Sequence, residues 1–221
     1  MQIGSVQLDG NIALAPMAGV TDLPFRLLCR EAGSAFAVTE MVSAKGYLCA
    51  ASGNRATQAL LLRAPQEGPV ALQLFGKEPE VMAEAARRLS DRGFCMIDLN
   101  MGCPAPKIAG AGEGAALLKE PVLAARIVES VVRATHLPVT VKMRIGWDDA
   151  HRCAVPFARM IEASGAKAIT VHGRTRMQFY AGMADWQAIA EVKAALQIPV
   201  WGNGDVASAM DAQRMQAQTG C

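Results

Sequence analysis

Short apolar runs alternate with longer helix-like stretches along this chain. The seven apolar runs are residues 12–15, 36–39, 70–74, 96–99, 139–141, 168–171 and 199–201. Amphipathic or alanine-rich stretches lie between them, the clearest at 78–92, 121–135, 154–164, 186–196 and 207–218. This alternation predicts a parallel β-sheet with helical crossovers. Because the runs are almost continuously apolar, we expect both faces of the sheet to be buried.

The spacing of the runs narrows the fold class. A distinctive polar or special residue follows each run at an interval of roughly thirty residues, the length of one βα unit. Seven such units favour an α/β fold of the (β/α)8 TIM-barrel type, whose active site forms at the carboxyl ends of the strands. We expect this barrel to be incomplete, with about seven βα units and the eighth strand missing. A doubly wound open sheet is the alternative, but residues 15–19 are not its G-x-G-x-x-G turn.

Local signals add detail to this fold. Three glycines, Gly33, Gly93 and Gly165, follow helical stretches in the position where a left-handed C-cap is favoured. At the N-terminal end, residues 3–14 contain an Asp9-Gly10 pair between two apolar segments. This pattern predicts a hairpin that leads into the first strand.

Composition limits the class of protein. The 221 residues suffice for one domain, and 52% apolar with 19% charged residues indicates a globular chain. The net charge of +2 neither indicates nor excludes nucleic-acid binding. The six cysteines include no C-x-x-C pair, so we expect reduced thiols and no metal site. With no signal peptide and no apolar run of about 18 residues, we expect a cytoplasmic protein that does not enter the membrane.

The most informative single residue is Cys103. The apolar run before it breaks at Gly102, and the thiol then stands in front of Pro104. A structural cysteine would more often lie inside the apolar run. A free thiol is mostly protonated at neutral pH, which suits a proton donor. A nucleophilic thiolate would want an adjacent histidine or a helix N-terminus, and the local sequence demands neither.

Further polar residues follow the other predicted strands. They are Glu40, Gln73, Asn100, Lys142, Arg144, His172, Arg174, Asn203 and Asp205. Each has a simpler interpretation: Gln73 as a polar strand end, His172 as a core histidine, and residues 203–205 as a turn with a helix N-cap. Lys142, at the end of a buried strand, needs an anionic partner. Because the barrel would bring all of them to one end, we interpret the group as an active site.

The donors of this group suit a flat, electron-rich ring. Gln, Lys, His and Asn side chains can bind its polar edge, and a lysine stabilises negative charge that develops on the ring. A flavin isoalloxazine has these needs. Cys103 would then face the ring from a loop.

At this level of detail the chain resembles the bacterial tRNA-dihydrouridine synthases. The most specific motifs are D-x-N-x-G-C-P at 98–104, H-G-R-T at 172–175 and N-G-D at 203–205, in this order and spacing. Further matching segments are 14–22, 24–26, 39–41, 73–76, 112–118, 141–147 and 171–176.

The resemblance implies an FMN enzyme that takes electrons from NADPH or NADH and reduces a uridine of tRNA to 5,6-dihydrouridine. Hydride would reach C6, and Cys103 would deliver the proton to C5. The target base would leave the base stack to reach the flavin. The partner would be tRNA, with no metal ion, and we expect a monomer.

The resemblance also implies a role for each site residue. The cofactor-binding residues would be Pro16, Met17 and Ala18 against the flavin, Gln73, Lys142 and His172 at its ring or ribityl chain, and Asn203, Gly204 and Asp205 at the phosphate and ribityl site. Asn100 would contact the uracil. Three arginines, Arg144, Arg174 and Arg176, would contact substrate or RNA phosphate.

In this family an eighth strand, a Gly-Arg pair and a C-terminal helical domain follow the segment that this chain matches. We therefore expect residues 1–221 to form a C-terminally truncated FMN-binding catalytic domain. Two other functions stay open at this level: an FMN barrel that acts on a free pyrimidine, and an inactive RNA-binding remnant.

Overall fold

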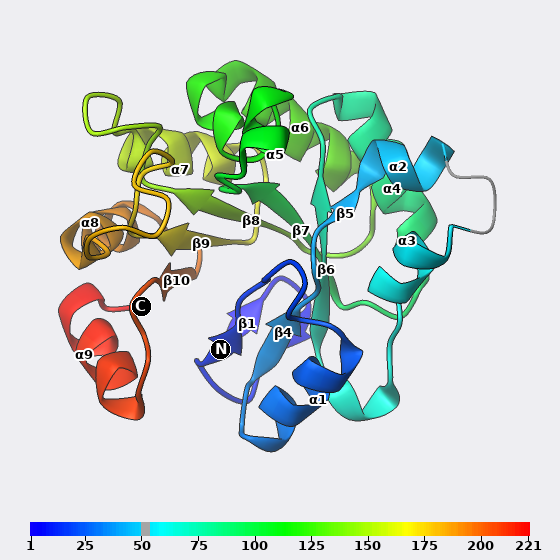
Figure 1. Cartoon of the computed structure of the whole chain (residues 1–221), viewed down its shortest axis with the longest axis horizontal. Coiled ribbons are helices and arrows are strands. Elements are labelled where there is room, and N and C mark those ends of the chain that lie inside the picture. The colour runs from blue at the N-terminus through cyan, green and yellow to red at the C-terminus, as the bar shows by residue number, and fades with distance from the viewer. Residues whose placement is uncertain (50–53) are drawn as a thin grey trace.

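The chain forms one curved, parallel sheet covered by helices (Figure 1), as seen in a computed structural model that describes residues 1–49 and 54–221. The strand order is β10-β9-β8-β7-β6-β4-β3. These strands are β3 (Ala13–Leu14), β4 (Phe36–Val38), β6 (Val70–Phe75), β7 (Met96–Met101), β8 (Val139–Arg144), β9 (Ala168–His172) and β10 (Val200–Asn203). Each of the seven predicted runs contains or overlaps one of them, and every neighbouring pair is parallel. The prediction of seven βα units is confirmed.

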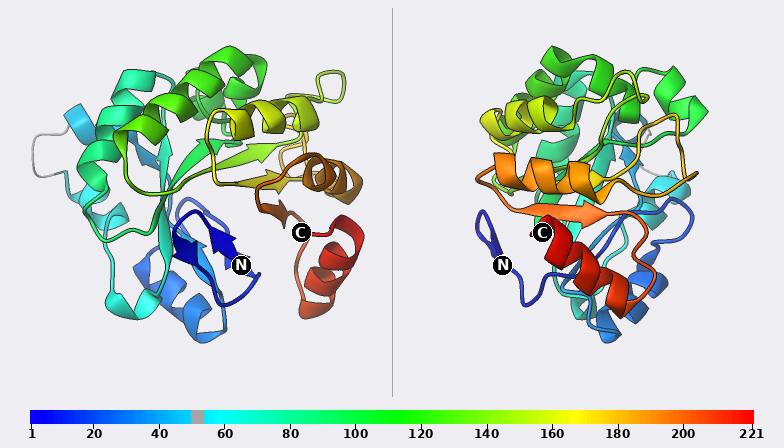
Figure 2. Two further views of the ribbon diagram at one scale, coloured as in Figure 1. Left: turned by 180° about the vertical axis from the view of Figure 1, so that it is seen from behind. Right: turned by 90° about the vertical axis from the view of Figure 1, so that its left-hand side faces the viewer.

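The longer helices lie on the outer, convex side of the sheet (Figures 1 and 2). They are α1 (Leu23–Glu31), α4 (Pro79–Leu89), α6 (Pro121–Ala134), α7 (Ala154–Ala163), α8 (Trp186–Ala195) and α9 (Ala209–Thr219). The shorter helical segments are α2 (Ala44–Cys49), α3 (Arg55–Leu60), η1 (Pro65–Glu67), α5 (Pro106–Gly110) and η2 (Gly114–Lys119).

Local sequence sets the helix ends. The Asp185 carboxylate accepts from the Ala188 N–H at the start of α8, and Ser208 caps α9 in the same way. The glycines predicted as C-caps have positive φ angles of 98° at Gly33, 83° at Gly93 and 102° at Gly165. The prediction is confirmed at Gly33 and Gly165, which directly follow the C-caps Ala32 and Ser164. It is wrong for Gly93, which lies three residues beyond Ser90, the C-cap of α4.

The N-terminal hairpin differs from the prediction. Its strands are β1 (Gln2–Ile3) and β2 (Val6–Gln7), and the turn contains Gly4 with φ +54°. Residues 9–10 were expected at the turn, but β3 pairs in parallel with β4 instead of folding back on the hairpin. A second short strand, β5 (Val42–Ser43), follows β4 along the same edge of β6.

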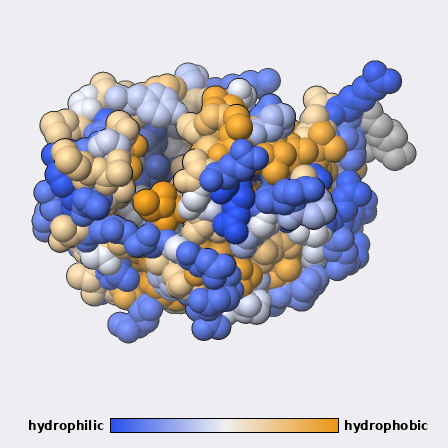
Figure 3. All heavy atoms as spheres, turned by 90° about the horizontal axis from the view of Figure 1, so that it is seen from below, coloured by the Kyte–Doolittle hydropathy of each residue, from blue (hydrophilic) through white to orange (hydrophobic). Residues whose placement is uncertain are grey.

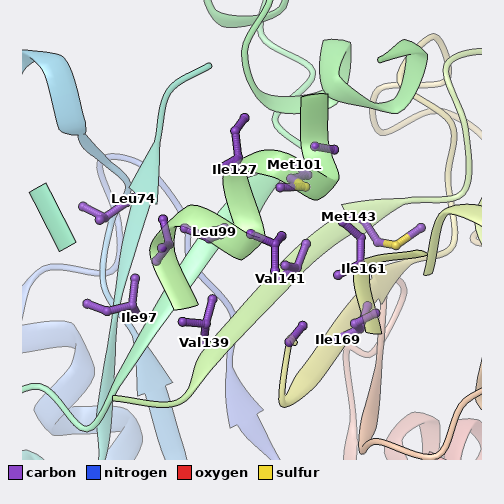
Figure 4. Packing of buried hydrophobic residues seen from close by; sticks show 14 of the residues in the cluster. Leu74, Ile97, Leu99, Met101, Ile127, Val139, Val141, Met143, Ile161 and Ile169 are labelled. Carbon is purple, nitrogen blue, oxygen red and sulfur yellow. The ribbon is translucent and has the colours of Figure 1, made fainter. Parts of the chain in front are cut away.

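The two faces of the strands differ in chemistry. Residues that point outward, such as Leu99, Val141 and Ile169, pack against Ile127 of α6 and Ile161 of α7 in the main core (Figure 4). A second apolar cluster, which includes Phe36, Met96 and Trp201, closes the inner side near the start of the strands.

Toward the carboxyl ends the inner positions become polar. Gln73 of β6, Asp98 and Asn100 of β7, and Thr140 of β8 are all at least nine-tenths buried. Both faces are therefore buried, as predicted, but the inner one carries the polar chemistry.

The sheet does not close into a full barrel. Among the described residues, β3 and β10 each pair with only one strand of the sheet. The α9 helix and the N-terminal strands stand on opposite sides of the resulting opening (Figures 1 and 2). Seen from below, apolar side chains are visible in a hollow on this side of the molecule (Figure 3). The architecture is an incomplete (β/α)8 barrel, as the sequence predicts.

Candidate active site

A cavity of about 380 Å³ lies between β3 and β10, at the opening of the sheet. Four of the residues predicted to bind the cofactor line it: Pro16, Met17, Lys142 and Asn203. Its wall is mainly apolar and includes Leu14, Phe36, Val38 and Trp201. The other five predicted cofactor residues do not line this cavity in the part of the chain that the structure describes.

Lys142 supplies the positive charge of the cavity. It belongs to β8, and its Nζ donates to Asn203 Oδ1 at 2.8 Å, which joins two predicted site residues from different strands. Burial of the ammonium lowers the pKa of Lys142 to about 8, although Asp98 partly offsets this. A partly buried lysine with a lowered pKa is a group able to hold or release a proton near neutral pH.

Cys103 stands just beyond β7, in a loop held from two sides. Asn100 Oδ1 accepts from the backbone N–H of Cys103 at 2.9 Å and from that of Gly102 at 3.2 Å. On the other side, the Cys103 carbonyl accepts from the Ala115 N–H at 3.1 Å. Gly114 has φ +59°, and a Cβ at this position would lie 2.9 Å from the Cys103 carbonyl oxygen. The thiol therefore has a defined place at the carboxyl end of β7.

His172, Arg174, Gly204 and Asp205 form a second group. Arg174 pairs with Asp205 at 2.7 Å and also lies 3.3 Å from His172 Nε2. Since a guanidinium only donates, Nε2 accepts, and the neutral ring carries its proton on Nδ1. A Cβ on Gly204 would lie 2.9 Å from His172 Cδ2, so only a glycine fits against this ring.

The charge state of His172 follows from its surroundings. Burial lowers the pKa of His172 to about 3, with smaller contributions from the positive charges of Lys142, Arg144 and Arg174. The imidazole is therefore neutral at physiological pH.

The three predicted substrate arginines have different surroundings. Arg144 is 2% exposed and donates to the backbone carbonyls of Gly102, Thr175 and Phe179. Arg174 is buried in the ion pair with Asp205 described above. The Arg176 guanidinium lies 4.8 Å from the centre of the Trp147 ring, in a cation–π contact. Arg144 and Arg174 thus link loops to one another, and Arg176 lies closest to the surface.

The remaining predicted residues are placed as follows. Ala18 is exposed in the loop after β3. Gln73 is 1% exposed and donates from Nε2 to Asp98 Oδ2 at 2.7 Å, while its Oε1 accepts from Asn100 Nδ2 at 2.9 Å.

Sequence reasoning missed Asp98 and Thr140. Both lie inside strands and point inward, where the Thr140 hydroxyl donates to Asp98 Oδ1 at 2.6 Å. Burial raises the pKa of Asp98, and its hydrogen bonds from Thr140 and Gln73 oppose that rise. One signal was available, because a charged residue in the middle of an apolar run needs buried partners.

No helix in residues 1–49 and 54–221 is long and apolar enough to cross a bilayer. Over the same ranges, no three His, Cys, Asp or Glu side chains cluster in a way that could hold a metal ion.

A solved structure with a similar fold supports the architecture. It is described as "Crystal structures and site-directed mutagenesis study of nitroalkane oxidase from Streptomyces ansochromogenes". The match covers 96% of this chain and 63% of the other, with a TM-score of 0.51 and 18% sequence identity. At this identity the likeness concerns the fold alone.

Comparisons of sequence are more specific. This chain is 48% identical over 220 residues to a probable tRNA-dihydrouridine synthase of Rhodobacter capsulatus, covering 100% of this chain and 67% of the relative. It is 46% identical to tRNA-dihydrouridine synthase B of Xanthomonas axonopodis and 43% identical to that of Pseudomonas aeruginosa, covering 100% of this chain and 65% of each relative. The chain thus spans about two thirds of the length of these relatives. The family model for dihydrouridine synthase matches residues 13–221, and the chain belongs to the dihydrouridine synthase family.

Proposed function

We propose that residues 1–221 form the FMN-binding catalytic domain of a tRNA-dihydrouridine synthase, which reduces a uridine of tRNA to 5,6-dihydrouridine. One observation carries the proposal: a thiol on a firmly held loop follows β7, and a partly buried lysine belongs to the neighbouring strand β8. Asn100 and Lys142 are opposite each other in the β7–β8 register. Cys103 follows three residues after Asn100.

The cavity fits a flavin in its chemistry. Its apolar wall suits a flat ring, and the Lys142 ammonium and the Asn203 amide offer donors for a polar edge. Trp201, also in the wall, has a buried Nε1–H with no partner among the described residues. Pro16, Met17 and Ala18 would lie against the ring, and Gln73, Lys142 and His172 would contact the ring or the ribityl chain. Asn203, Gly204 and Asp205 would serve the phosphate and ribityl end.

When bound, FMN that has been reduced by NADPH or NADH supplies hydride to C6 of the uracil. Cys103 then holds the proton that C5 needs, and its loop sets where that proton is delivered. Lys142 would stabilise negative charge that develops on the bound ring. Neutral His172 acts as a hydrogen-bond donor through Nδ1–H rather than as a cation.

Asn100 is proposed as a uracil contact, and Arg176 as a contact for RNA phosphate. Arg144 and Arg174 are proposed to serve the substrate site mainly by holding the loops that surround it, because carbonyls and Asp205 already engage their guanidinium groups. The proposed site of action is a soluble compartment shared with tRNA, with the protein as a monomer.

The test is an assay of dihydrouridine in tRNA with the FMN-loaded chain and NADPH. Cys103→Ala is expected to lower turnover by about 10²-fold or more while leaving the flavin absorbance spectrum in place. Cys49→Ala, at an exposed position on α2, is the matched control. Full activity of Cys103→Ala would remove the thiol from the mechanism.

Two further measurements separate the alternatives. If free uracil oxidises the reduced flavin as well as tRNA does, the substrate is a free pyrimidine. The RNA-binding remnant is supported instead if the protein is colourless, does not quench the fluorescence of added FMN, and still shifts tRNA on a gel.

A further inference from the structure

A continuous chain of buried hydrogen bonds runs from Asp98 to the backbone of Cys103. The Asp98 carboxylate accepts from Gln73 Nε2, and Gln73 Oε1 accepts from Asn100 Nδ2. Asn100 Oδ1 then accepts from the N–H groups of Gly102 and Cys103. Each donor–acceptor distance lies between 2.7 and 3.2 Å. The bonds cross from β7 to β6 and back, so the strand register brings the three side chains together.

The donor-to-acceptor direction of this hydrogen-bond chain is determined at both of its ends. Backbone N–H groups can only donate, so Asn100 must present its oxygen to Gly102 and Cys103 and its amino group to Gln73. At the far end, the two Asp98 oxygens accept from Gln73 Nε2 and from the Thr140 hydroxyl, so Gln73 presents its amino group to Asp98. The two requirements agree, and each amide has a single orientation that satisfies every partner.

We infer that Asp98 is a positioning residue for the Cys103 loop, which it orients through the amides of Gln73 and Asn100. The catalytic meaning of this role rests on the proposed function of Cys103. The hydrogen-bond chain itself does not depend on that function. Asp98 also lines the cavity between β3 and β10. Two side chains lie between Asp98 and the Cys103 loop, so it acts on that loop through Gln73 and Asn100.

The cost of burying Asp98 supports this role over simple packing. Its side chain is inside the sheet with 3% of the residue exposed, where a carboxylate is unfavourable unless it is paired or hydrogen-bonded. Burial raises the pKa of Asp98, and this rise is opposed by the donors on its two oxygens, Gln73 Nε2 and Thr140 Oγ1, and by the nearby charge of Lys142. An apolar residue would avoid this cost but would leave the Gln73 amide without an anchor.

Exchanging Asn and Asp at positions 98 and 100 tests this role, because the side chains keep their shape and only their donors and acceptors change. In Asn100→Asp, one oxygen still accepts from the loop, but the other faces Gln73 Oε1, and no orientation of Gln73 satisfies both carboxylates. Adding Asp98→Asn resolves the conflict, because the Gln73 amide can turn over. The amino group at 98 then donates to Gln73 Oε1, and Gln73 Nε2 donates to the carboxylate at 100. Thr140 still donates to the oxygen at 98.

The Asp98→Asn variant alone is the intermediate case. Its amide oxygen can still accept from Gln73 Nε2, but its amino group then faces Thr140, whose hydroxyl must turn to accept. We expect this variant to lie between the wild type and Asn100→Asp.

The readout is the rate at which iodoacetamide alkylates Cys103 in the FMN-loaded full chain, followed by peptide mass spectrometry from pH 6 to 10. Cys95 lies on the same tryptic peptide and is the internal reference, since burial raises its pKa to about 11. The limiting rate at high pH reports access to the thiol separately from its ionisation. We expect about a tenfold faster limiting rate in Asn100→Asp and a return to within about twofold of wild type in the double variant.

Equal Cys103 rates in all four proteins would overturn the inference, as would a double variant no closer to wild type than Asn100→Asp. If Asn100→Asp does not fold, folding of the double variant supports the inference and its failure contradicts it. A parallel dihydrouridine assay keeps the two proposals apart. An inactive wild type would count against the proposed function, while the alkylation rates would still decide the role of Asp98.

Discussion

The Arg144 guanidinium donates its Nε–H to the carbonyl oxygen of Gly102 at 3.0 Å. This hydrogen bond connects β8, which carries Arg144, to the loop that follows β7. Its Nη1 group donates to the carbonyls of Thr175 and Phe179 in the loop after β9. A single buried side chain thus connects two active-site loops. Burial lowers the pKa of Arg144 to about 10, so the group stays charged at neutral pH.

Replacing Arg144 by lysine is expected to loosen both loops. An ammonium cannot reproduce the planar fork that reaches three carbonyls, and the unfolding free energy should fall by about 2–3 kcal/mol. Urea denaturation measures this loss, and turnover on tRNA should fall with it. Arg159→Lys, at an exposed position of α7, is the control and should change neither quantity. An unchanged denaturation midpoint in Arg144→Lys would contradict the connecting role.

Gly114→Ala is expected to displace the Cys103 loop. Residue 114 has φ +59°, and a new Cβ would lie 2.9 Å from the Cys103 carbonyl oxygen and 3.0 Å from its Cβ. The Cys103 loop must shift, because the new Cβ would meet a backbone oxygen and not the end of a flexible side chain that could move away. We expect lower turnover and an altered Cys103 alkylation rate.

Gly110→Ala is the matched control for this loop. Its Cβ would meet nothing within 4 Å, and the residue ends the short helix α5. We expect wild-type stability and activity. Similar losses in both glycine variants would mean that the contact at Gly114 is not the cause.

Lys142 predicts a pH dependence of stability. Its pKa in the folded protein is about 8, against an ordinary lysine pKa of 10.5. Between these values the unfolded chain binds more protons, so stability should rise as pH increases from 8 toward 10.5. Urea denaturation of the ligand-free chain at pH 7.5, 8.5 and 9.5 would show this rise.

Lys142→Met removes the titrating group while keeping most of its length. The rise attributed to Lys142 should therefore be missing from the curve of Lys142→Met and should appear as the difference between the two proteins' curves. Parallel curves for wild type and Lys142→Met would show that this lysine is not the source.

His172 is expected to remain neutral in mildly acidic solution. Burial lowers its pKa to about 3, so the folded protein does not take up a proton on this ring at pH 5. The unfolded chain binds that proton below about pH 6.5, so this group destabilises the fold as pH falls from 6.5 toward 3. An NMR titration of the imidazole Cε1–H, assigned with His172→Gln, tests this. A titration midpoint near 6.5 would contradict it.

Much of the fold could be predicted from local patterns. The apolar runs coincide with the strands, and Gly33 and Gly165 directly follow the C-caps of α1 and α7 as expected. Hydrophobic periodicity and the conformational preference of glycine depend on only a few neighbouring residues, so each can be recognised within a single segment of the sequence. The hairpin prediction failed for a related reason. Both Gly4 and Gly10 are compatible with a turn, and pairing of β3 with β4 decides between them.

The site could be predicted only in part. Cys103, Lys142 and His172 stand out because each polar residue follows an apolar run, and a parallel barrel gathers such positions at one end. Asp98 and Thr140 lie within the runs, and nothing local shows that they face inward. The partners of Arg144 are 31 and 35 residues away for Thr175 and Phe179, beyond the reach of any sequence period.

The sequence by itself therefore determined the βα alternation, the position of the thiol after its strand and the family. The tertiary structure decided which face each strand residue presents and which amide meets which carboxylate. It also decided that β3 and β10 leave an open side lined by Lys142 and Asn203. The physical reason is that strand formation depends on neighbours in the chain, whereas a buried hydrogen bond depends on register between strands. Asp98 illustrates this, since only the β6–β7 register places it against Gln73.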